Sequence, residues 1–186
     1  MFERQAIPDV ILVRPTKHGD HRGFFSETFH GLRYAEAGID APFVQDNHSL
    51  SATVGTLRGL HFQIAPSAQG KLVRCTAGRI LDVAVDIRVG SPTFGQHVSA
   101  ELTAEGGEQF WVPVGFAHAF VTLEPDTEVQ YKVTSYYDPE ADRGLAWDDP
   151  ALGIDWGLGG DEPVLSAKDT EHPRLADLPQ YFTYQG

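Results

Sequence analysis

The stretch Thr56-Leu-Arg-Gly-Leu-His-Phe-Gln63 places two polar side chains, Arg58 and His61, inside a segment that otherwise has the composition of a buried strand. Burying an unpaired polar group costs about 1–3 kcal/mol, and burying an unpaired charge costs more. Both side chains therefore need a polar partner or a ligand. A histidine satisfied by a backbone carbonyl would meet this need without any function, so the rest of the chain has to decide.

Arg58 and His61 lie three positions apart, which puts them on opposite faces of a regular strand with a period of two. Both can face inward only if the strand bulges between them. Gly59 is a suitable position for such a bulge, and we expect an irregular strand there.

The composition favours one acidic domain. The 186 residues are 41% hydrophobic and carry a formal net charge of −12, and no internal repeat or low-complexity tract divides them. We expect a single domain over residues 1–186, with residues 147–186 as a C-terminal cover. The negative charge argues against a nucleic acid or an anionic membrane as the main partner, because both require a basic surface.

The remaining global features predict a soluble, cytoplasmic protein. Residues 1–8 lack the basic and apolar regions of a signal peptide, and no later stretch has the length of a membrane span. Cys75 is the only cysteine, which excludes an intrachain disulfide and a cysteine-based zinc site. We expect it to be a small buried hydrophobic residue.

Many short strands separated by turn residues indicate a β-sandwich or barrel. Along residues 80–89, alternate positions beginning with Leu81 form an apolar face, and Asp82 and Asp86 lie on the opposite face. The expected strands cover residues 10–14, 24–29, 43–47, 80–89, 96–102, 109–112, 116–123 and 127–135.

Helical signals are few. One helix is expected over residues 30–37, where Gly38 supplies the C-terminal stop. Helical turns are expected over residues 166–170 and 174–178. Tryptophans in the C-terminal cover, Trp147 and Trp156, are expected to pack and not to bind a ligand.

Two motifs, Gly55 with His61 six residues later and Pro113-Val-Gly-Phe-Ala-His118, resemble the paired signatures of the cupin jelly-roll barrel. A metal-binding cupin would be expected to carry a second histidine where Gln63 stands, followed by a glutamate. Two histidines are too few for the three or four protein ligands of a catalytic metal. We therefore expect a mainly β, cupin-like jelly-roll barrel with a few short helices and without a metal.

Strand parity places Lys71, His118 and Tyr131 on faces that they share with apolar residues, so one interior could hold all three. Each has a plainer explanation when taken alone. Lys71 could be a solvated lysine at the rim, and Tyr131 a core tyrosine with its hydroxyl at the surface. Asp169 follows Ser166 at the spacing of a helix capping box.

Histidine, lysine and tyrosine in one interior suit proton abstraction from a carbon beside a ketone. Histidine can act as the base at neutral pH, and a lysine can stabilise the enolate oxygen. A tyrosine on the opposite face can return the proton, which inverts the stereocentre. This set of side chains predicts an epimerase.

The chain resembles the dTDP-4-dehydrorhamnose 3,5-epimerase family in eight segments, which occur in the family's order between about Ile7 and Leu178. These are Arg22-Gly-Phe-Phe-Ser-Glu27-Thr-Phe, Gln45-Asp-Asn47-His-Ser, Leu57-Arg-Gly-Leu-His61-Phe-Gln, Gly70-Lys71-Leu-Val-Arg, Asp82-Val-Ala-Val-Asp86-Ile-Arg, Val112-Pro-Val-Gly-Phe-Ala-His118-Ala-Phe, Tyr131-Lys-Val-Thr and Ser166-Ala-Lys168-Asp169. The resemblance implies an isomerase that inverts C3 and C5 of dTDP-4-keto-6-deoxyglucose, giving dTDP-4-keto-L-rhamnose for dTDP-rhamnose biosynthesis. It implies no cofactor.

The resemblance also implies catalytic roles for four residues. His61 matches the base, and Asp169 matches the carboxylate that orients it and holds its charge. Tyr131 matches the acid on the other face of the sugar, and Lys71 matches the lysine that stabilises the enolate.

Substrate-binding roles follow in the same way. Tyr137 matches a ring that stacks on the thymine, and the other matching positions in the barrel are Gln45, Asn47, Arg58, Lys71, His118, Asp142 and Lys168. Arg22, Phe25 and Glu27 match residues that the neighbouring subunit contributes. A homodimer with an exchanged N-terminal strand is therefore implied.

One departure and three alternatives stay open. Asp142 stands where the family is expected to carry a glutamate, so its substrate contact is open. The presence of both His61 and Tyr131 favours inversion without deciding which carbons, so a C3 or C5 mono-epimerase, or an enzyme that shifts the keto group, is the nearest alternative. A metal-dependent cupin oxygenase is disfavoured by the ligand count, and a non-catalytic sugar-nucleotide-binding cupin by the complete catalytic set.

Overall fold

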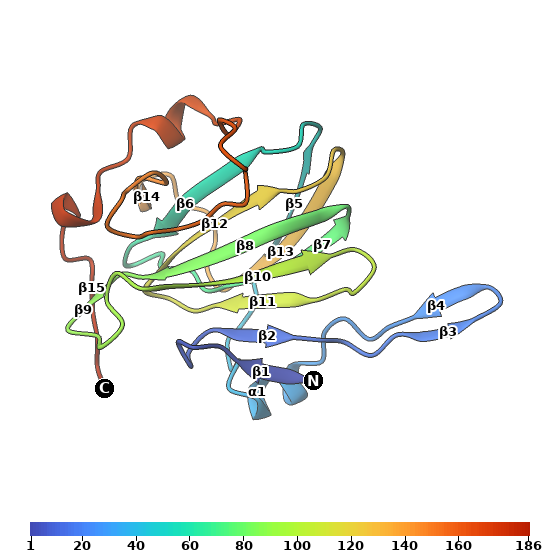
Figure 1. Ribbon diagram of the computed structural model, residues 1–186. Helices are drawn as coiled ribbons and strands as arrows, with labels where there is room; N and C mark the ends of the chain where they lie inside the picture. Colours follow the sequence, from blue (N-terminus) through green and yellow to red (C-terminus); the bar gives the residue numbers. More distant parts are fainter.

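The computed structural model describes residues 1–186 and consists mainly of two facing β-sheets (Figure 1). The first sheet has the strand order β1-β2-β11-β7-β13-β5, and all neighbouring strands in it are antiparallel. Its strands are β1 (Phe2–Arg4), β2 (Ile11–Val13), β5 (Gln45–Ser51), β7 (Lys71–Ala77), β11 (Gln109–Val112) and β13 (Thr127–Val133). The mainly β fold expected from the sequence is confirmed.

The second sheet has the order β10-β8-β12-β6-β14 and is also antiparallel. Its strands are β6 (Leu57–Gln63), β8 (Arg79–Asp86), β10 (His97–Thr103), β12 (Phe116–Thr122) and β14 (Asp142–Gly144). Two small pairs stand apart from the sheets: β3 (His18–Asp20) with β4 (Gly23–Phe25), and β9 (Arg88–Val89) with β15 (Phe182–Thr183).

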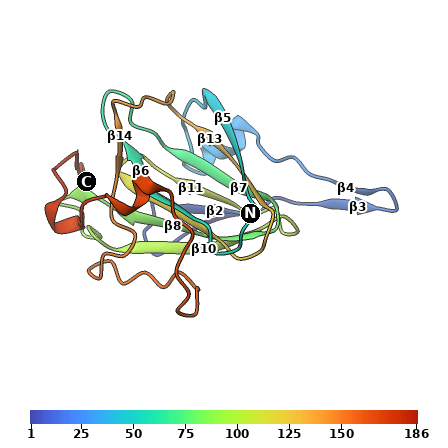
Figure 2. The same ribbon diagram turned by 90° about the horizontal axis from the view of Figure 1, so that it is seen from above.

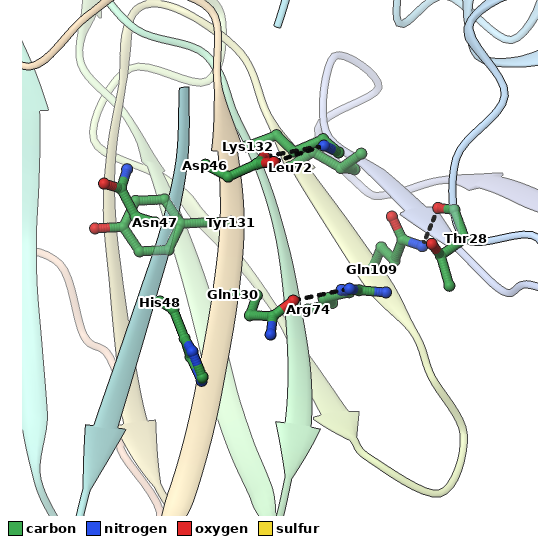
Figure 3. A pocket seen from close by; sticks show the side chains of 10 residues that line it. All are labelled: Thr28, Asp46, Asn47, His48, Leu72, Arg74, Gln109, Gln130, Tyr131 and Lys132. Atoms are coloured by element: carbon green, nitrogen blue, oxygen red, sulfur yellow. Dashed lines mark hydrogen bonds and ion pairs between the residues drawn. The ribbon is translucent and has the colours of Figure 1, made fainter. Parts of the chain in front are cut away.

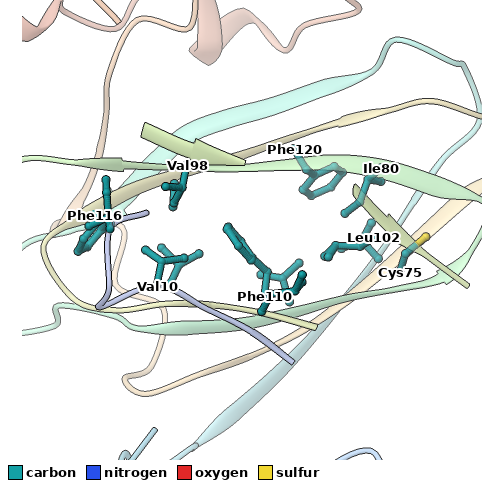
Figure 4. Close-up of a cluster of buried hydrophobic side chains, with 14 residues drawn as sticks. Val10, Cys75, Ile80, Val98, Leu102, Phe110, Phe116 and Phe120 are labelled. Atoms are coloured by element: carbon teal, nitrogen blue, oxygen red, sulfur yellow. The ribbon is translucent and has the colours of Figure 1, made fainter. Parts of the chain in front are cut away.

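The space between the two sheets holds the main hydrophobic core (Figure 4). Phe110 and Val73 come from the first sheet, and Ile80, Leu102 and Phe120 come from the second. All five side chains are buried, and burial of each large apolar side chain contributes about 1.5–3 kcal/mol. Cys75 lies in the same cluster, so its expected role as a small buried hydrophobic residue is confirmed.

Strand β8 is apolar on both faces, and the face with the longest apolar run points away from this core. Val83 and Val85 belong to a second buried cluster, on the outer side of the second sheet, whereas Ile80 and Ala84 face the first sheet. Asp82 shares that inward face and is fully buried. The alternation along this strand thus carries a carboxylate into the interior.

The C-terminal segment covers the outer face of the second sheet. Apolar side chains from residues 147–186 pack on the second cluster, among them Ile154, Leu165 and Phe182. Trp156 is buried there and donates a hydrogen bond of 3.1 Å from Nε1 to the carbonyl of Trp147. The packing role expected for the two tryptophans is confirmed. Two 3₁₀ turns, η1 (Ala167–Thr170) and η2 (Leu175–Asp177), occur where helical turns were expected.

Helix α1 (Gly31–Glu36) covers part of the outer face of the first sheet. Its Tyr34 packs in a third cluster with Ile39 and Trp111, and Gly38 ends the helix with a φ of 98°. The expected helix and its glycine stop are confirmed. Before the helix, the β3–β4 hairpin extends far from the rest of the molecule in both views (Figures 1 and 2).

The expected strand boundaries are largely confirmed, and the main error lies at the hairpin. The run 24–29 was expected to be a strand after a loop, but only Gly23–Phe25 is extended and paired, and residues 18–20 form the strand opposite it. The short strands β1, β14 and β15 were not anticipated. No helix in the structure has the length and apolar character needed to span a membrane.

Candidate active site

A cavity of about 440 Å³ opens between the two sheets and is lined by most of the expected chemical groups. His61 and His118 reach it from β6 and β12 of the second sheet, while Lys71 and Tyr131 reach it from β7 and β13 of the first. Asp169 enters from η1 of the C-terminal segment. A second cavity of about 320 Å³ adjoins the first, since both are lined by His61, Lys71 and Tyr131.

The expected bulge in β6 is present. His118 pairs with His61, but Phe120 pairs with Arg58, so β6 advances by three residues while β12 advances by two. The extra residue lies at or beside Gly59, which has a φ of 129° and whose position leaves no room for a side chain against Ala119. Arg58 and His61 consequently both line the cavity.

His61 and Asp169 form the shortest contact between titratable side chains in the cavity. His61 Nε2 lies 2.6 Å from Asp169 Oδ1, and Asp169 is 3% exposed. When Nε2–H donates this hydrogen bond, the other ring nitrogen, Nδ1, is free to accept a proton. The hydrogen bonds from His61 and Ser166 lower the pKa of Asp169 against the opposing effect of burial, which keeps the carboxylate charged.

Asp169 also fulfils the capping role considered from the sequence. Ser166 Oγ donates to Asp169 Oδ2 at 2.7 Å, and the reciprocal backbone contacts of a capping box are present at the start of η1. One oxygen thus faces the histidine and the other holds the turn. The structural and the functional interpretation of this residue are compatible.

Lys71 lies beside the same histidine. Its Nζ donates a hydrogen bond of 3.2 Å to the carbonyl of His61. Loss of hydration lowers the pKa of Lys71 to about 8, although the negative charges of Asp142 and Asp82 oppose the shift. Lys71 is therefore still mainly protonated at pH 7 and can present a positive charge to an oxygen in the cavity.

His118 has a carboxylate partner that the sequence did not predict as part of the site. Its Nε2 lies 2.8 Å from Asp82 Oδ1, and both side chains are buried. Burial lowers the pKa of His118 and raises that of Asp82, because each charged form loses hydration. The second oxygen of Asp82, Oδ2, is buried without a hydrogen-bond partner.

Tyr131 lines the cavity from β13 of the first sheet, and Arg58 lines it from β6 of the second. Burial raises the pKa of Tyr131, and the nearby Arg58 charge opposes that rise, so the phenol keeps its proton at neutral pH. Arg58 donates hydrogen bonds to Ser51 Oγ at 3.2 Å and to the Leu50 carbonyl at 3.3 Å. These contacts hold the guanidinium at the cavity.

The remaining expected binding residues of the barrel surround the second cavity, which is lined by Gln45, Asn47, Tyr137, Asp142 and Lys168. Gln45 Nε2 donates to Asn47 Oδ1 at 2.9 Å, and the Tyr137 backbone N–H donates to Gln45 Oε1 at 3.0 Å. Lys168 forms an ion pair with Asp142, and Tyr137 presents an exposed ring. The structure therefore brings these residues together next to the catalytic candidates.

Arg22, Phe25 and Glu27 lie outside both cavities. Arg22 pairs with Asp20 within the projecting hairpin, and Glu27 pairs with Arg33 at 2.8 Å. Phe25 is 71% exposed. The chain by itself does not bring these three residues to the cavity that they were expected to complete.

A third cavity, of about 340 Å³, lies on the outer face of the first sheet (Figure 3). Its lining is mostly polar and internally paired: Arg74 donates to Gln130 at 2.8 Å, and Lys132 donates to Asp46 at 2.9 Å. Of the expected catalytic residues only Tyr131 borders it. This surface therefore lacks the base and the lysine needed for the expected chemistry.

The chain is similar to known proteins over nearly its whole length. The family model for dTDP-4-dehydrorhamnose 3,5-epimerase matches residues 4–177. Relatives of that name from Sinorhizobium fredii and Pseudomonas aeruginosa are 57% and 54% identical; the alignments cover 98% and 94% of this chain and 93% and 95% of theirs. A solved dTDP-6-deoxy-D-glucose-3,5-epimerase from Legionella pneumophila, in complex with dTDP-4-keto-L-rhamnose, superimposes with a TM-score of 0.95 at 45% identity and covers 100% of this chain and 99% of its own.

The fold and the cavity together define a cupin-like protein with histidine, lysine and tyrosine side chains in a cavity between its sheets. The chain belongs to the dTDP-4-dehydrorhamnose 3,5-epimerase family. The resemblance drawn from the sequence is thereby confirmed.

Proposed function

We propose that this protein inverts C3 and C5 of dTDP-4-keto-6-deoxyglucose to give dTDP-4-keto-L-rhamnose. The carrying observation is the hydrogen bond of 2.6 Å between His61 and Asp169, set in one cavity with Lys71 and Tyr131. This set supplies a base, an enolate stabiliser and an acid without any further group.

The chemistry follows from the positions of these side chains. Nδ1 of His61 removes the proton beside the keto group, and Asp169 stabilises the imidazolium that forms. The electron pair moves to the keto oxygen, where protonated Lys71 stabilises the enolate. Tyr131 then gives its phenolic proton to the opposite face of the carbon, which inverts it.

Substrate binding is assigned to the polar groups of both cavities. We assign contacts with the sugar and the pyrophosphate to Arg58 and His118, which both line the first cavity. A guanidinium suits phosphate oxygens because it donates two parallel hydrogen bonds. Tyr137 offers its exposed ring for stacking on the thymine. The other proposed contacts come from Gln45, Asn47, Asp142 and Lys168.

We further propose a homodimer in which the N-terminal hairpin of each chain completes the cavity of its partner. Support comes from the hairpin itself, since Phe24 and Phe25 are 65% and 71% exposed on a segment that projects away from the sheets. Exposed aromatic residues of this size indicate an interaction surface. Arg22 and Glu27 would then reach a substrate held by the other subunit. The cytoplasmic location stays a prediction.

The test is proton exchange during turnover. The protein is incubated with dTDP-4-keto-6-deoxyglucose in deuterated water, and the sugar protons are followed by NMR. Loss of the C3 and C5 proton signals, with a product that a reductase converts to dTDP-rhamnose, is the expected result. Exchange at one carbon would establish a mono-epimerase, and binding without exchange at either carbon would support a non-catalytic module.

A further inference from the structure

His172 lies beside the proposed base and has no hydrogen bond from its Nε2. The rings of His172 and His61 are nearly perpendicular, with centroids 5.6 Å apart. His172 Nε2 is buried and has no hydrogen bond, and the side chain is only 10% exposed. A buried polar atom left unpaired costs about 1–3 kcal/mol. A ligand that binds this nitrogen would remove that cost.

Two elements hold the His172 ring in place. The next residue, Pro173, accepts a backbone hydrogen bond of 2.8 Å from Ala146. On the other side the ring rests against Gly144 of β14, where an added side chain would overlap with the imidazole. Gly144 in turn pairs with His61 across the sheet, so the two histidines are positioned by adjacent backbone segments.

The three groups have the spacing of a metal site. Asp169 Oδ1 lies 2.6 Å from His61 Nε2 and 3.8 Å from His172 Nε2, and one ligand atom from each of the three residues lies within 4.8 Å of the others. Tetrahedral zinc with bonds of about 2.0–2.1 Å separates its ligand atoms by roughly 3.3 Å and two bound imidazole centres by about 5 Å. The two distances from Asp169 Oδ1, 2.6 and 3.8 Å, lie below and above the ligand separation of zinc, and the ring separation of 5.6 Å lies above that of bound imidazoles. Small shifts of the side chains would bring the three groups to the zinc distances.

We propose that His61, Asp169 and His172 form a binding site for a divalent transition-metal ion such as Zn²⁺, and that occupation of this site inhibits the enzyme. The donor set of two imidazoles and one carboxylate leaves a fourth position for water, as in open zinc sites. Ser166 Oγ fixes the carboxylate from behind at 2.7 Å. Two cations lie near the site: Lys168 is paired with Asp142, which offsets its charge, and Lys71 donates a hydrogen bond to the His61 carbonyl.

This site differs from the one that the cupin motifs would suggest. Gln63 stands at the missing ligand position, and its amide is occupied by the Ser67 carbonyl at 2.6 Å and the Asp138 N–H at 2.9 Å. His118 is bound to Asp82 instead. Counting histidines within the two motifs therefore misses ligands that the C-terminal segment brings to His61.

Inhibition follows from the chemistry of imidazole and rests on the proposed epimerase function. A neutral histidine that binds a metal through Nε2 carries its remaining proton on Nδ1. The nitrogen that faces the substrate then has no lone pair to accept a proton. Metal binding itself does not depend on that function and can be measured without any substrate.

The first experiment titrates the metal-free protein with Zn²⁺ by calorimetry and with Co²⁺ by visible absorption. We expect one equivalent to bind, and His172→Asn to weaken binding about tenfold or more, because the short amide cannot reach the position of Nε2. His172→Phe provides a second variant that keeps a ring in this place. His48→Asn is the matched control, since His48 is exposed and paired with Glu128 elsewhere. Equal affinities of the wild type and both His172 variants would overturn the site.

The second experiment measures deuterium exchange with and without Zn²⁺. We expect inhibition of the wild type that a chelator reverses, together with turnover by the His172 variants that resists Zn²⁺. Equal inhibition of the wild type and the variants would reject inhibition through this site. Stoichiometric metal binding by a protein without epimerase activity would refute the proposed function alone, and turnover by a protein without stoichiometric binding would refute the metal site alone.

Discussion

Asp82 on β8 and His118 on β12, which lie diagonally across two adjacent strands of the second sheet, share a hydrogen bond of 2.8 Å inside the barrel. Replacing Asp82 by leucine would leave the His118 N–H unsatisfied. We expect a loss of about 1–3 kcal/mol in the free energy of unfolding and a KM raised about tenfold, because His118 loses its orientation. Urea titration and steady-state kinetics measure both effects. Asp82→Asn keeps an acceptor and should restore most of the stability; an Asp82→Leu protein with normal KM and stability would contradict the assignment.

The low pKa of Lys71 gives activity an upper pH limit. Because the lysine acts in its charged form, turnover should fall as the pH rises through about 8, and a pH profile of kcat checks this. Lys71→Met should remove most turnover. Lys132→Met is the control, since Lys132 pairs with Asp46 on the outer face and should leave the profile unchanged.

The lowered pKa of Lys71 also predicts how stability depends on pH: stability should rise with pH where activity falls. The unfolded chain holds a proton on Lys71 up to its ordinary pKa of 10.5, whereas the folded chain releases it near 8. Between these values the unfolded state binds more protons, so the free energy of unfolding contributed by Lys71 rises with pH. Below pH 8 the buried charge is a constant penalty. Lys71→Met should therefore be more stable by about 1–2 kcal/mol at pH 7, measured by urea unfolding.

Separate variants distinguish proton removal from proton return. His61→Ala should abolish exchange of the sugar protons with deuterated water, because it removes the proposed base and the other histidine of the cavity, His118, is paired with the buried Asp82. Tyr131→Phe should retain part of the exchange but lower formation of the inverted product about 100-fold. NMR of one reaction mixture reports both quantities. Normal turnover by His61→Ala would exclude the mechanism.

The exposed hairpin predicts a dimer that depends on aromatic contacts. Phe25→Asp should shift the protein from dimer to monomer in light scattering and reduce activity, while the thermal unfolding of the sheets changes little, since Phe25 is 71% exposed within its own chain. Val114→Asp, at another exposed apolar position, is the control. A wild type that is already monomeric and active would reject subunit exchange.

Most strands could be predicted from the sequence because their alternation is enforced by burial. Residues 109–112 match β11, and the conflict in parity between Arg58 and His61 correctly indicated the bulge at Gly59. The hairpin was misjudged because its side chains pack on little of their own chain, so no buried face imposes a pattern. Strand β14 is too short to carry a periodic signal.

The site was only partly visible in the sequence. Resemblance to a known family selected the residues that line the cavities. Asp82 occurs in one of the matching segments but was not expected in the site, and His172 lies outside these segments. Aspartates on one face of an alternating strand, as at Asp82 and Asp86, have the pattern of a solvated face. Their burial depends on which face of the second sheet turns inward. The position of His172 near His61 depends on its contact with Gly144, which joins segments that are distant in the chain, so it could not be predicted from the sequence.

The two oxygens of Asp169 link the C-terminal segment to the base, one through the turn at Ser166 and the other through His61. Detachment of residues 166–172 from the sheet and loss of the base's partner are therefore one event. The fraction of enzyme molecules that can catalyse is then set by the equilibrium between the attached and the detached segment. The free energy of this local opening can be much smaller than that of global unfolding. On heating, the activity of this protein should accordingly decline with hydrogen-exchange protection of this segment, before the sheets themselves unfold.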